Sequence, residues 1–312
     1  MIWLIGAGRM SIDYMRVLKA QDEDVIVIGR GKASAYVFEE KTNHKVRIGG
    51  LVSFLNKDPQ VPKAAIVSVG IEELYSTSIQ LLEYGVKSIL VEKPAGLSFD
   101  QVKHLKLVSK EKKAEVFIAY NRRFFSSVIK LQHLIEKDGG VTSFNFELTE
   151  WSHIIKNLDK SSNILAKWFL GNSTHVADLA FFLGGKPNQI SCFNTGKLAW
   201  HPSSSIFAGA GISDNGALFN YGADWISAGR WSVEILTNKN RYVLRPMESL
   251  QVQNRGSVQL NLISLDDELD KIYKPGLYLQ VEAFLKKDIK ALCSIDEQTM
   301  LFPIYEKMAG YN

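Results

Sequence analysis

The first 120 residues alternate between short apolar runs and segments in which apolar residues recur with helical spacing. Apolar strands separated by helices form parallel sheets with helices on both faces, because both faces of such strands must be covered. The alternation therefore predicts an α/β N-terminal domain, with a parallel doubly wound sheet, over residues 1–122. The expected strands are Ile2–Ile5, Val25–Ile28, Ala64–Val69, Ser88–Val91 and Val116–Ala119, with helices such as Leu74–Tyr84 and Phe99–Ser109 between them.

The pattern changes after residue 122. Strand-like runs there follow one another directly, and Asn215-Gly216 is typical of a hairpin turn. We therefore expect residues 123–312 to form an α+β C-terminal domain with a large, mainly antiparallel open sheet. Its expected strands are 141–151, 189–194, 205–212, 217–221, 231–237, 241–245 and 258–263, and its expected helices are 127–137, 175–183, 278–287 and 296–308.

Composition excludes several functional classes. The hydrophobic fraction of 46% and charged fraction of 22% are ordinary for a globular enzyme. The net charge of +4 is spread along the chain, so we expect no nucleic-acid partner. No apolar segment approaches the roughly eighteen residues of a membrane span. Cys192 and Cys293 are far apart, so we expect neither a metal site nor a disulfide, and a cytoplasmic protein with reduced thiols.

A glycine-rich turn follows the first expected strand. Gly6 permits a tight turn, Gly8 lets the backbone approach a pyrophosphate, and the next helix offers unpaired N–H groups and a positive dipole end. Ser11 replaces the usual third glycine and is still small. This is the dinucleotide-binding arrangement of a Rossmann domain. The expected cofactor-binding residues at this turn are Gly6, Ala7, Gly8, Arg9 and Met10.

The end of the second expected strand indicates which dinucleotide binds. Enzymes that use NAD usually place a carboxylate there to bind the ribose 2′-hydroxyl, but this chain has Gly29-Arg30. An arginine can pair with the 2′-phosphate of NADP. We therefore expect NADP in preference to NAD, with Arg30 as a cofactor-binding residue. The alternative is that Arg30 and Lys32 are two solvated surface cations.

Glu92-Lys93-Pro94 follows the fourth expected strand of the first domain, at the edge where open α/β sheets bind ligands. Pro94 favours an extended backbone at Lys93. A lysine beside a cationic nicotinamide ring is suited to proton transfer, because its pKa would be lowered. A purely structural role for this Lys-Pro pair is the alternative.

These motifs together resemble the glucose–fructose oxidoreductase and inositol dehydrogenase (Gfo/Idh/MocA) family. The resemblance rests on the Gly-Ala-Gly-Arg-Met turn, on Glu92-Lys93-Pro94 and on Tyr120-Asn121-Arg122-Arg123-Phe124. It implies that Lys93 positions substrate and nicotinamide and is catalytic, and that the segment around Tyr120 and Arg122 borders the substrate. It also implies that Ser68 and Glu92 lie beside the cofactor.

The second-domain signature of that family is only partly present. The family usually has Asp-x-Gly-x-His-x-x-Asp, whereas this chain has Gly171-Asn172-Ser173-Thr174-His175-Val176-Ala177-Asp178. The resemblance implies that His175 is a catalytic acid or base and that Asn172 borders the substrate. The role of the earlier aspartate transfers to no residue, because Gly171 stands at its position.

The resemblance implies an NAD(P)-dependent oxidoreductase that moves a hydride between nicotinamide and a secondary alcohol or ketone of a sugar, sugar acid or nucleotide sugar. Two alternatives stay open: an NAD-dependent glycosidase of the same fold, and a non-enzymatic cofactor-binding or regulatory protein. We also expect a homo-oligomer, a dimer or tetramer. Its interface is expected on the outer face of the C-terminal sheet, where Phe219, Tyr221, Trp225 and Trp231 would need an apolar cover.

Overall fold

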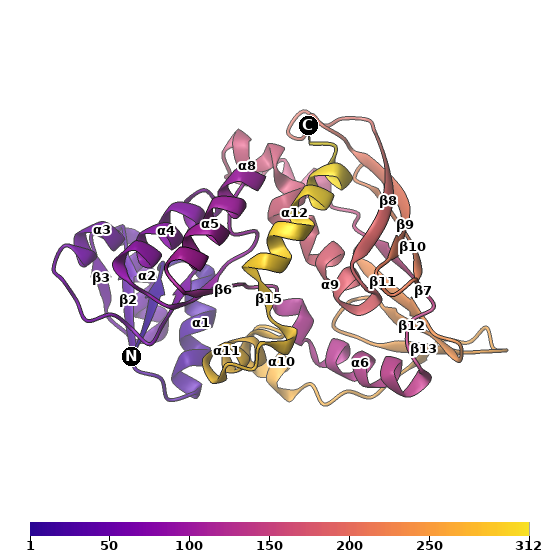
Figure 1. Cartoon of the computed structure of the whole chain (residues 1–312), viewed down its shortest axis with the longest axis horizontal. Helices are drawn as coiled ribbons and strands as arrows, with labels where there is room; N and C mark the ends of the chain where they lie inside the picture. The colour runs from indigo at the N-terminus through magenta and orange to yellow at the C-terminus, as the bar shows by residue number, and fades with distance from the viewer. Residues whose placement is uncertain (312) are drawn as a thin grey trace. The chain divides into compact units, whose positions relative to one another are not determined.

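The computed structural model describes residues 1–311 and divides the chain into two units (Figure 1). The first unit combines residues 1–121 with residues 269–302, and the second combines residues 122–268 with the chain from Pro303 onward. The predicted boundary after residue 122 lies next to the observed one. Residues 269–302, however, were expected in the C-terminal domain and return to the first unit, where two of their elements pack on its helices and sheet.

The first unit is built on a parallel sheet with one antiparallel edge strand. The strand order is β15-β6-β5-β4-β1-β2-β3, so the order reverses between β1 and β4 as in a Rossmann fold. The predicted fold class is confirmed, and the short strand β3 is an addition to the predicted set. The strands are β1 (Ile2–Ile5), β2 (Val25–Gly29), β3 (Val46–Ile48), β4 (Ala64–Val67), β5 (Ser88–Val91), β6 (Glu115–Ile118) and β15 (Cys293–Ser294).

Helices cover this sheet, and α4 and α5 pack side by side while α1 packs against α11 (Figure 1). Ser98 caps α5 by accepting a hydrogen bond from the Gln101 N–H at 3.3 Å, as its sequence pattern indicates. The returning segment adds α11 to the helix layer and β15 to β6. The helices are α1 (Arg9–Ala20), α2 (Lys32–Thr42), α3 (Gly50–Leu55), α4 (Leu74–Tyr84), α5 (Phe99–Glu111), α10 (Glu268–Ile272), α11 (Leu277–Lys286) and, up to Phe302, α12 (Ile295–Ala309), with 3₁₀ turns η1 (Ile71–Glu73) and η4 (Ile289–Ala291).

The second unit contains an eight-stranded sheet, ordered β14-β13-β12-β11-β7-β10-β9-β8. Its pairs are antiparallel except that β7 and β10 are parallel, so the predicted mainly antiparallel sheet is confirmed. The strands are β7 (Ser143–Glu147), β8 (Pro187–Thr195), β9 (Ile206–Ser213), β10 (Leu218–Asp224), β11 (Ser232–Leu236), β12 (Asn240–Leu244), β13 (Gln251–Asn254) and β14 (Asn261–Leu262).

Helix α9 (Thr174–Gly184) packs against β7 and β11 on the inner face of this sheet. Phe181 of α9 makes edge-to-face contacts with Phe146 and Phe219, at ring-centre distances of 5.5 and 5.6 Å. Further elements of this unit are η2 (Asn121–Phe124), α6 (Ser126–Asp138), α7 (Ser152–Ile155), α8 (Ser162–Ala166) and the π-helical turn η3 (Phe169–Ser173).

The expected aromatic outer face of this sheet is wrong. Phe219 and Tyr221 are each 3% exposed, and Trp225 and Trp231 are also buried. Phe219 packs on Phe181 of α9, and Tyr221 stacks on Phe146 of β7. Trp225 and Trp231 lie just outside the strands and contact Phe169 and His175.

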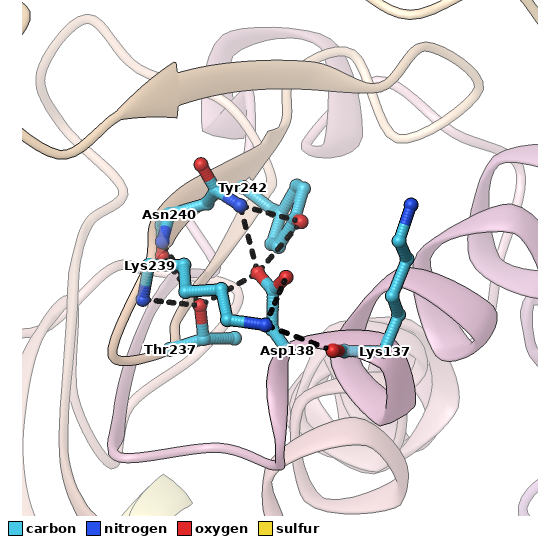
Figure 2. A network of polar contacts seen from close by, with 6 residues as sticks. All are labelled: Lys137, Asp138, Thr237, Lys239, Asn240 and Tyr242. Atoms are coloured by element: carbon cyan, nitrogen blue, oxygen red, sulfur yellow. Dashed lines mark hydrogen bonds and ion pairs between the residues drawn. The ribbon is translucent and has the colours of Figure 1, made fainter.

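Asp138, the last residue of α6, fastens this helix to the β11–β12 hairpin (Figure 2). Its Oδ2 accepts hydrogen bonds from Thr237 Oγ1, Asn240 Nδ2 and the Tyr242 hydroxyl, each at 2.8 Å. Lys239 Nζ donates to the backbone carbonyl of Lys137 at 3.1 Å. A single buried carboxylate thus holds the end of a helix on the turn between two strands.

No helix among residues 1–311 is long and apolar enough to cross a membrane.

Candidate cofactor and substrate sites

The turn after β1 requires glycine at its first position. Gly6 has φ of +119°, and a Cβ atom there would lie 2.6 Å from the Ser68 carbonyl oxygen. Ser11, in the first turns of α1, shares a 2.7 Å hydrogen bond with the Ser68 hydroxyl. The small Ser11 side chain therefore joins the helix to the residue after β4, where a larger side chain would separate them.

The space in front of Gly8 is open, since a Cβ there would meet no atom within 4 Å. The N-cap residue of α1 is Gly8, which has no side chain to cap the helix, and the first turn of α1 contains no acidic residue. The positive end of the helix dipole thus faces an open cradle, which fits a dinucleotide pyrophosphate. Gly6, Ala7, Gly8 and Ser68 line the cavity here, which has a volume of about 620 Å³.

Arg30 lies on the rim of the same cavity, immediately after β2. Gly29 before it has no room for a side chain, because a Cβ would lie 2.8 Å from Val46 Cγ1. Arg30 is 80% exposed, and its Nη1 pairs with Glu73 Oε1 at 2.5 Å across the cavity rim. The cation is therefore available at the ribose end of a dinucleotide cradle, with a carboxylate as its neighbour.

Glu92 and Lys93 follow β5 at the same carboxyl edge of the sheet. The buried Tyr14 hydroxyl donates to Glu92 Oε1 at 2.8 Å. Burial raises the pKa of Glu92, although the charge of Lys93 and the hydrogen bond from Tyr14 favour its ionised form. The following Pro94 is held by Gln298 of α12, whose Nε2 donates to the Pro94 carbonyl at 3.0 Å. The residues before and after Lys93 are thus both fixed by hydrogen bonds.

Tyr120 lies just after β6 at this edge and is buried. Asn121 beside it donates through Nδ2 to the Pro275 carbonyl at 2.9 Å, which attaches the returning segment to this strand end. Arg9 and Met10 begin α1 but do not line the cavity. The predicted cofactor residues of the first unit therefore all follow the carboxyl ends of parallel strands, and most of them surround one cavity.

In the second unit, His175 lies in the first turn of α9 and is buried. Its ring centre lies 6.3 Å from that of Trp231. Asp178, one turn later, accepts two hydrogen bonds from Arg123, at 2.9 Å from Nε and 2.5 Å from Nη2. Both members of this pair are at most 2% exposed, so Asp178 anchors α9 to the η2 segment.

A buried carboxylate that the sequence patterns did not reveal contacts Asn172 and Ser173, shortly before His175 in the chain. Glu150, three residues after β7, is 1% exposed. Its Oε1 accepts hydrogen bonds from Asn172 Nδ2 at 2.9 Å and Ser173 Oγ at 2.8 Å, and its Oε2 accepts from Arg230 Nη1 at 3.2 Å. Burial raises the pKa of Glu150, while Ser173, Arg230 and Asn172 favour the charged form.

The contact between Ser173 and Glu150 bears on the altered family signature at residues 171–178. Where the family has an aspartate and a glycine, the chain has Gly171 and Ser173, and Ser173 binds Glu150 from another element. The segment 169–173 is a π-helical turn, a feature often found at functional sites. A carboxylate is thus present in this neighbourhood, contributed by the end of β7.

Two arginines stack on one indole in the same unit. The guanidinium carbons of Arg122 and Arg230 lie 4.7 and 4.3 Å from the ring centre of Trp231. Arg230 also lies 4.7 Å from the ring centre of Trp151, which is 44% exposed. The sequence offered no signal for Glu150, Trp151 or Arg230, because Arg230 comes from a different loop than the other two and none of them matches a motif.

The structure thus groups the predicted residues into two sets. Gly6, Ala7, Gly8, Arg30 and Ser68 share a cavity in the first unit, with Glu92, Lys93 and Tyr120 at the same sheet edge. Arg122, Asn172 and His175 belong to the second unit. Joint action of Lys93 and His175 on one substrate remains a prediction.

Residues 1–120 match a family model described as the oxidoreductase family with an NAD-binding Rossmann fold, Gfo/Idh/MocA. The matched region includes the glycine-rich cradle and Glu92-Lys93-Pro94, which carry the resemblance noted from the sequence. Residues 1–120 are thus similar to the NAD-binding Rossmann domain of the Gfo/Idh/MocA oxidoreductases. The cofactor of that domain is a nicotinamide dinucleotide, and the cradle at Gly8 fits it. No curated protein matches the chain in sequence.

Solved structures share the whole fold at low sequence identity. UDP-N-acetylglucosamine 3-dehydrogenase GnnA from Acidithiobacillus ferrooxidans is 14% identical with a TM-score of 0.76, covering 99% of this chain and 96% of its own. Levoglucosan dehydrogenase in complex with NADH and levoglucosan is 15% identical with a TM-score of 0.79, covering 99% and 96%. An oxidoreductase from Agrobacterium radiobacter in complex with NAD⁺, L-tartaric acid and magnesium is 13% identical with a TM-score of 0.78, covering 99% and 95%. These likenesses establish the fold.

Proposed function

We propose that this protein is a dehydrogenase or reductase that moves a hydride between a nicotinamide dinucleotide and a secondary alcohol or ketone of a sugar, sugar acid or nucleotide sugar. The observation that carries the proposal is the open cradle at Gly8 on the carboxyl edge of the parallel sheet, with Lys93 on a braced segment of the same edge. The fold is also that of a UDP-N-acetylglucosamine dehydrogenase and a levoglucosan dehydrogenase.

The protein's own residues supply the proton chemistry in this proposal. Nicotinamide, when bound, accepts or gives the hydride. Lys93 and His175 hold or accept the proton of the substrate hydroxyl, because each carries a nitrogen base at an element end that the resemblance places beside substrate. Tyr120, Arg122 and Asn172 are the proposed substrate neighbours.

NADP is the proposed cofactor in preference to NAD. Support comes from the cavity rim, where Arg30 follows β2 and Gly29 leaves no room for a carboxylate. The guanidinium of an arginine suits a phosphate monoester better than a ribose 2′-hydroxyl.

A non-enzymatic role is favoured by one observation, the glycine at position 171 where the family has an aspartate. Glu150 weakens that objection, since its carboxylate is held by the two residues that follow Gly171. We therefore favour an enzyme.

The decisive assay follows the absorbance of NADPH, starting from either NADPH or NADP⁺, with a panel of sugars, sugar acids and nucleotide sugars. With the substrate that responds, Lys93→Ala is expected to lower kcat by about 10²–10⁴ and to leave the Kd for cofactor unchanged. His175→Asn is expected to lower kcat as well, whereas His153→Asn, a change at an exposed position, serves as the control.

Near-normal kcat in Lys93→Ala would limit this lysine to a structural role. Cleavage of a glycoside without net change in NADPH would identify the glycosidase alternative. Tight cofactor binding with no turnover across the panel would favour the regulatory one.

A further inference from the structure

Two indoles and one carboxylate fix the side chain of Arg230, although this side chain is partly exposed. Its guanidinium lies over two indoles, at 4.3 Å from the Trp231 ring centre and 4.7 Å from that of Trp151. Trp151 is itself fixed, because its Nε1 donates to the Gly229 carbonyl at 3.0 Å. A third contact, from Nη1 to Glu150 Oε2 at 3.2 Å, sets the rotation of the guanidinium plane.

The Nε–Nη2 edge of the Arg230 guanidinium has the geometry to bind an anionic group. Within the described residues, Nη1 is the nitrogen of Arg230 that donates a hydrogen bond, so Nε and Nη2 keep their protons for a ligand. The side chain is 42% exposed, so a ligand can reach part of it. Nε–H and Nη2–H form a planar fork that fits the two oxygens of a carboxylate or phosphate. Little side-chain entropy remains to be lost on binding, because the contacts already fix the fork.

The surroundings of Arg230 add a second cation and an apolar platform. Arg122, which the resemblance places at the substrate, stacks on the same Trp231 ring at 4.7 Å. Trp151 presents an indole that is 44% exposed, a surface that suits the C–H face of a sugar ring. Two guanidinium groups thus lie against one indole, next to the carboxylate of Glu150.

We propose that Arg230, held by Trp151, Trp231 and Glu150, is the binding site for an anionic oxygen group of the substrate, so that the protein acts on an acidic sugar. The inference rests on the proposed function, since it narrows the substrate class of that same reaction. The shared chemistry is a carboxylate or phosphate oxygen pair, which a sugar acid carries as its carboxylate and a nucleotide sugar as its diphosphate.

Calorimetric titration of the intact protein, saturated with NADPH, measures sugar binding separately from hydride transfer and so tests the proposed anion site at Arg230. The probes are D-glucose, D-glucuronate and UDP-glucose. Wild type is expected to bind one of the two anionic sugars about tenfold or more tightly than glucose, and Arg230→Gln is expected to lose that preference. A loss for glucuronate identifies the carboxylate as the group bound, and a loss for UDP-glucose identifies the diphosphate.

The matched control is Arg241→Gln. Arg241 is in the same unit, is also 42% exposed and also pairs with a glutamate, Glu234, but it stacks on no indole. Its substitution is expected to leave all three affinities unchanged. If Arg230→Gln unfolds, Arg230→Lys takes its place, because lysine keeps the positive charge but lacks the two parallel N–H donors. Arg230→Lys is expected to lower the affinity for the same anionic sugar several-fold.

The proposal is overturned if wild type binds neither anionic sugar more tightly than glucose, or if Arg230→Gln keeps the preference. It is also overturned if Arg241→Gln has an equal effect. Because binding and hydride transfer are measured separately, anion binding at Arg230 without turnover in the sugar panel would refute the proposed function alone.

Discussion

In the proposed function, the choice between the two nicotinamide dinucleotides rests on a single residue, Arg30. It stands where NAD enzymes usually have a carboxylate, and Gly29 before it cannot be enlarged, since a Cβ would lie 2.8 Å from Val46 Cγ1. The side chain is mostly exposed and pairs with Glu73. This pair means that a bound 2′-phosphate competes with Glu73 for the same guanidinium, so both residues belong in a test of cofactor choice.

We predict that wild type binds NADPH more tightly than NADH, and that Arg30→Ala weakens NADPH about tenfold to a hundredfold while NADH changes little. Glu73→Gln is the informative partner variant. It removes a negative charge beside the expected phosphate, so it should strengthen NADPH binding without affecting NADH. Fluorescence titration of both cofactors measures these affinities. Tighter binding of NADH to wild type would show the assignment to be wrong.

Among the elements, the junction between α6 and the β11–β12 hairpin depends on one carboxylate. Burial alone would raise the pKa of Asp138, but hydrogen bonds from Asn240, Thr237 and Tyr242 together hold it below its ordinary value (Figure 2). The lowered pKa means that the folded state favours the ionised carboxylate. The resulting stabilisation is complete above the unfolded-state value of about 4 and is lost as the pH falls through the folded-state value.

Asp138→Ala is therefore expected to lower the free energy of unfolding by about 2–4 kcal/mol at pH 7, because it leaves three donors without their acceptor. Urea unfolding at several pH values measures this. The difference between wild type and the variant should begin to shrink below about pH 4, where Asp138 of the unfolded chain takes up a proton, and should be smallest below the lower pKa of the folded state. A difference that stays constant down to pH 2 would contradict the role of the charge. Asp214→Ala, a change at an exposed hairpin position, provides a comparison.

For the whole molecule, the open face of the second sheet decides whether the chain associates with itself. Cross-strand register places Ile212 beside Leu218 and Phe193 beside Ala208 on the outward side of β8, β9 and β10. Phe193 is 68% exposed and Leu218 61%. The part of the sheet around β7, β11 and β12 is instead covered by ion pairs such as Glu147–Arg245. An apolar strip beside a charged one resembles a subunit interface more than a solvated surface.

We predict a dimer or tetramer that forms through this outer face, with the exposed apolar side chains of β8–β10 replacing the buried aromatic residues first expected there. Light scattering at micromolar concentration should give a multiple of 35.0 kDa. Replacing Phe193 and Leu218 together by Asp should shift the protein toward monomer, since two buried charges cannot be accommodated without partners. A wild-type protein that is already monomeric would disprove the prediction, as would a double variant with unchanged mass.

Much of the first unit follows from the sequence because its signals are local. The run Ile2–Ile5 and the helix Leu74–Tyr84 were predicted with the bounds that the structure has. Continuous apolar strands, a Gly-x-Gly turn and a capping Ser98 each report a structure formed by residues a few positions apart. The short β3 was missed because only one of its three side chains, Val46, is buried, which leaves too little apolar pattern to detect.

Only the tertiary structure decided which face of the second sheet is apolar and which residues lie around Glu150. A period of two predicts that side chains alternate, but it does not say which set meets α9, so the aromatic residues were assigned to the wrong face. Glu150, Trp151 and Arg230 could not be found either, since 22 residues separate Glu150 from Asn172 and 80 separate it from Arg230 along the chain. Buried polar groups must find partners wherever the fold provides them, and sequence spacing carries no record of such partnerships.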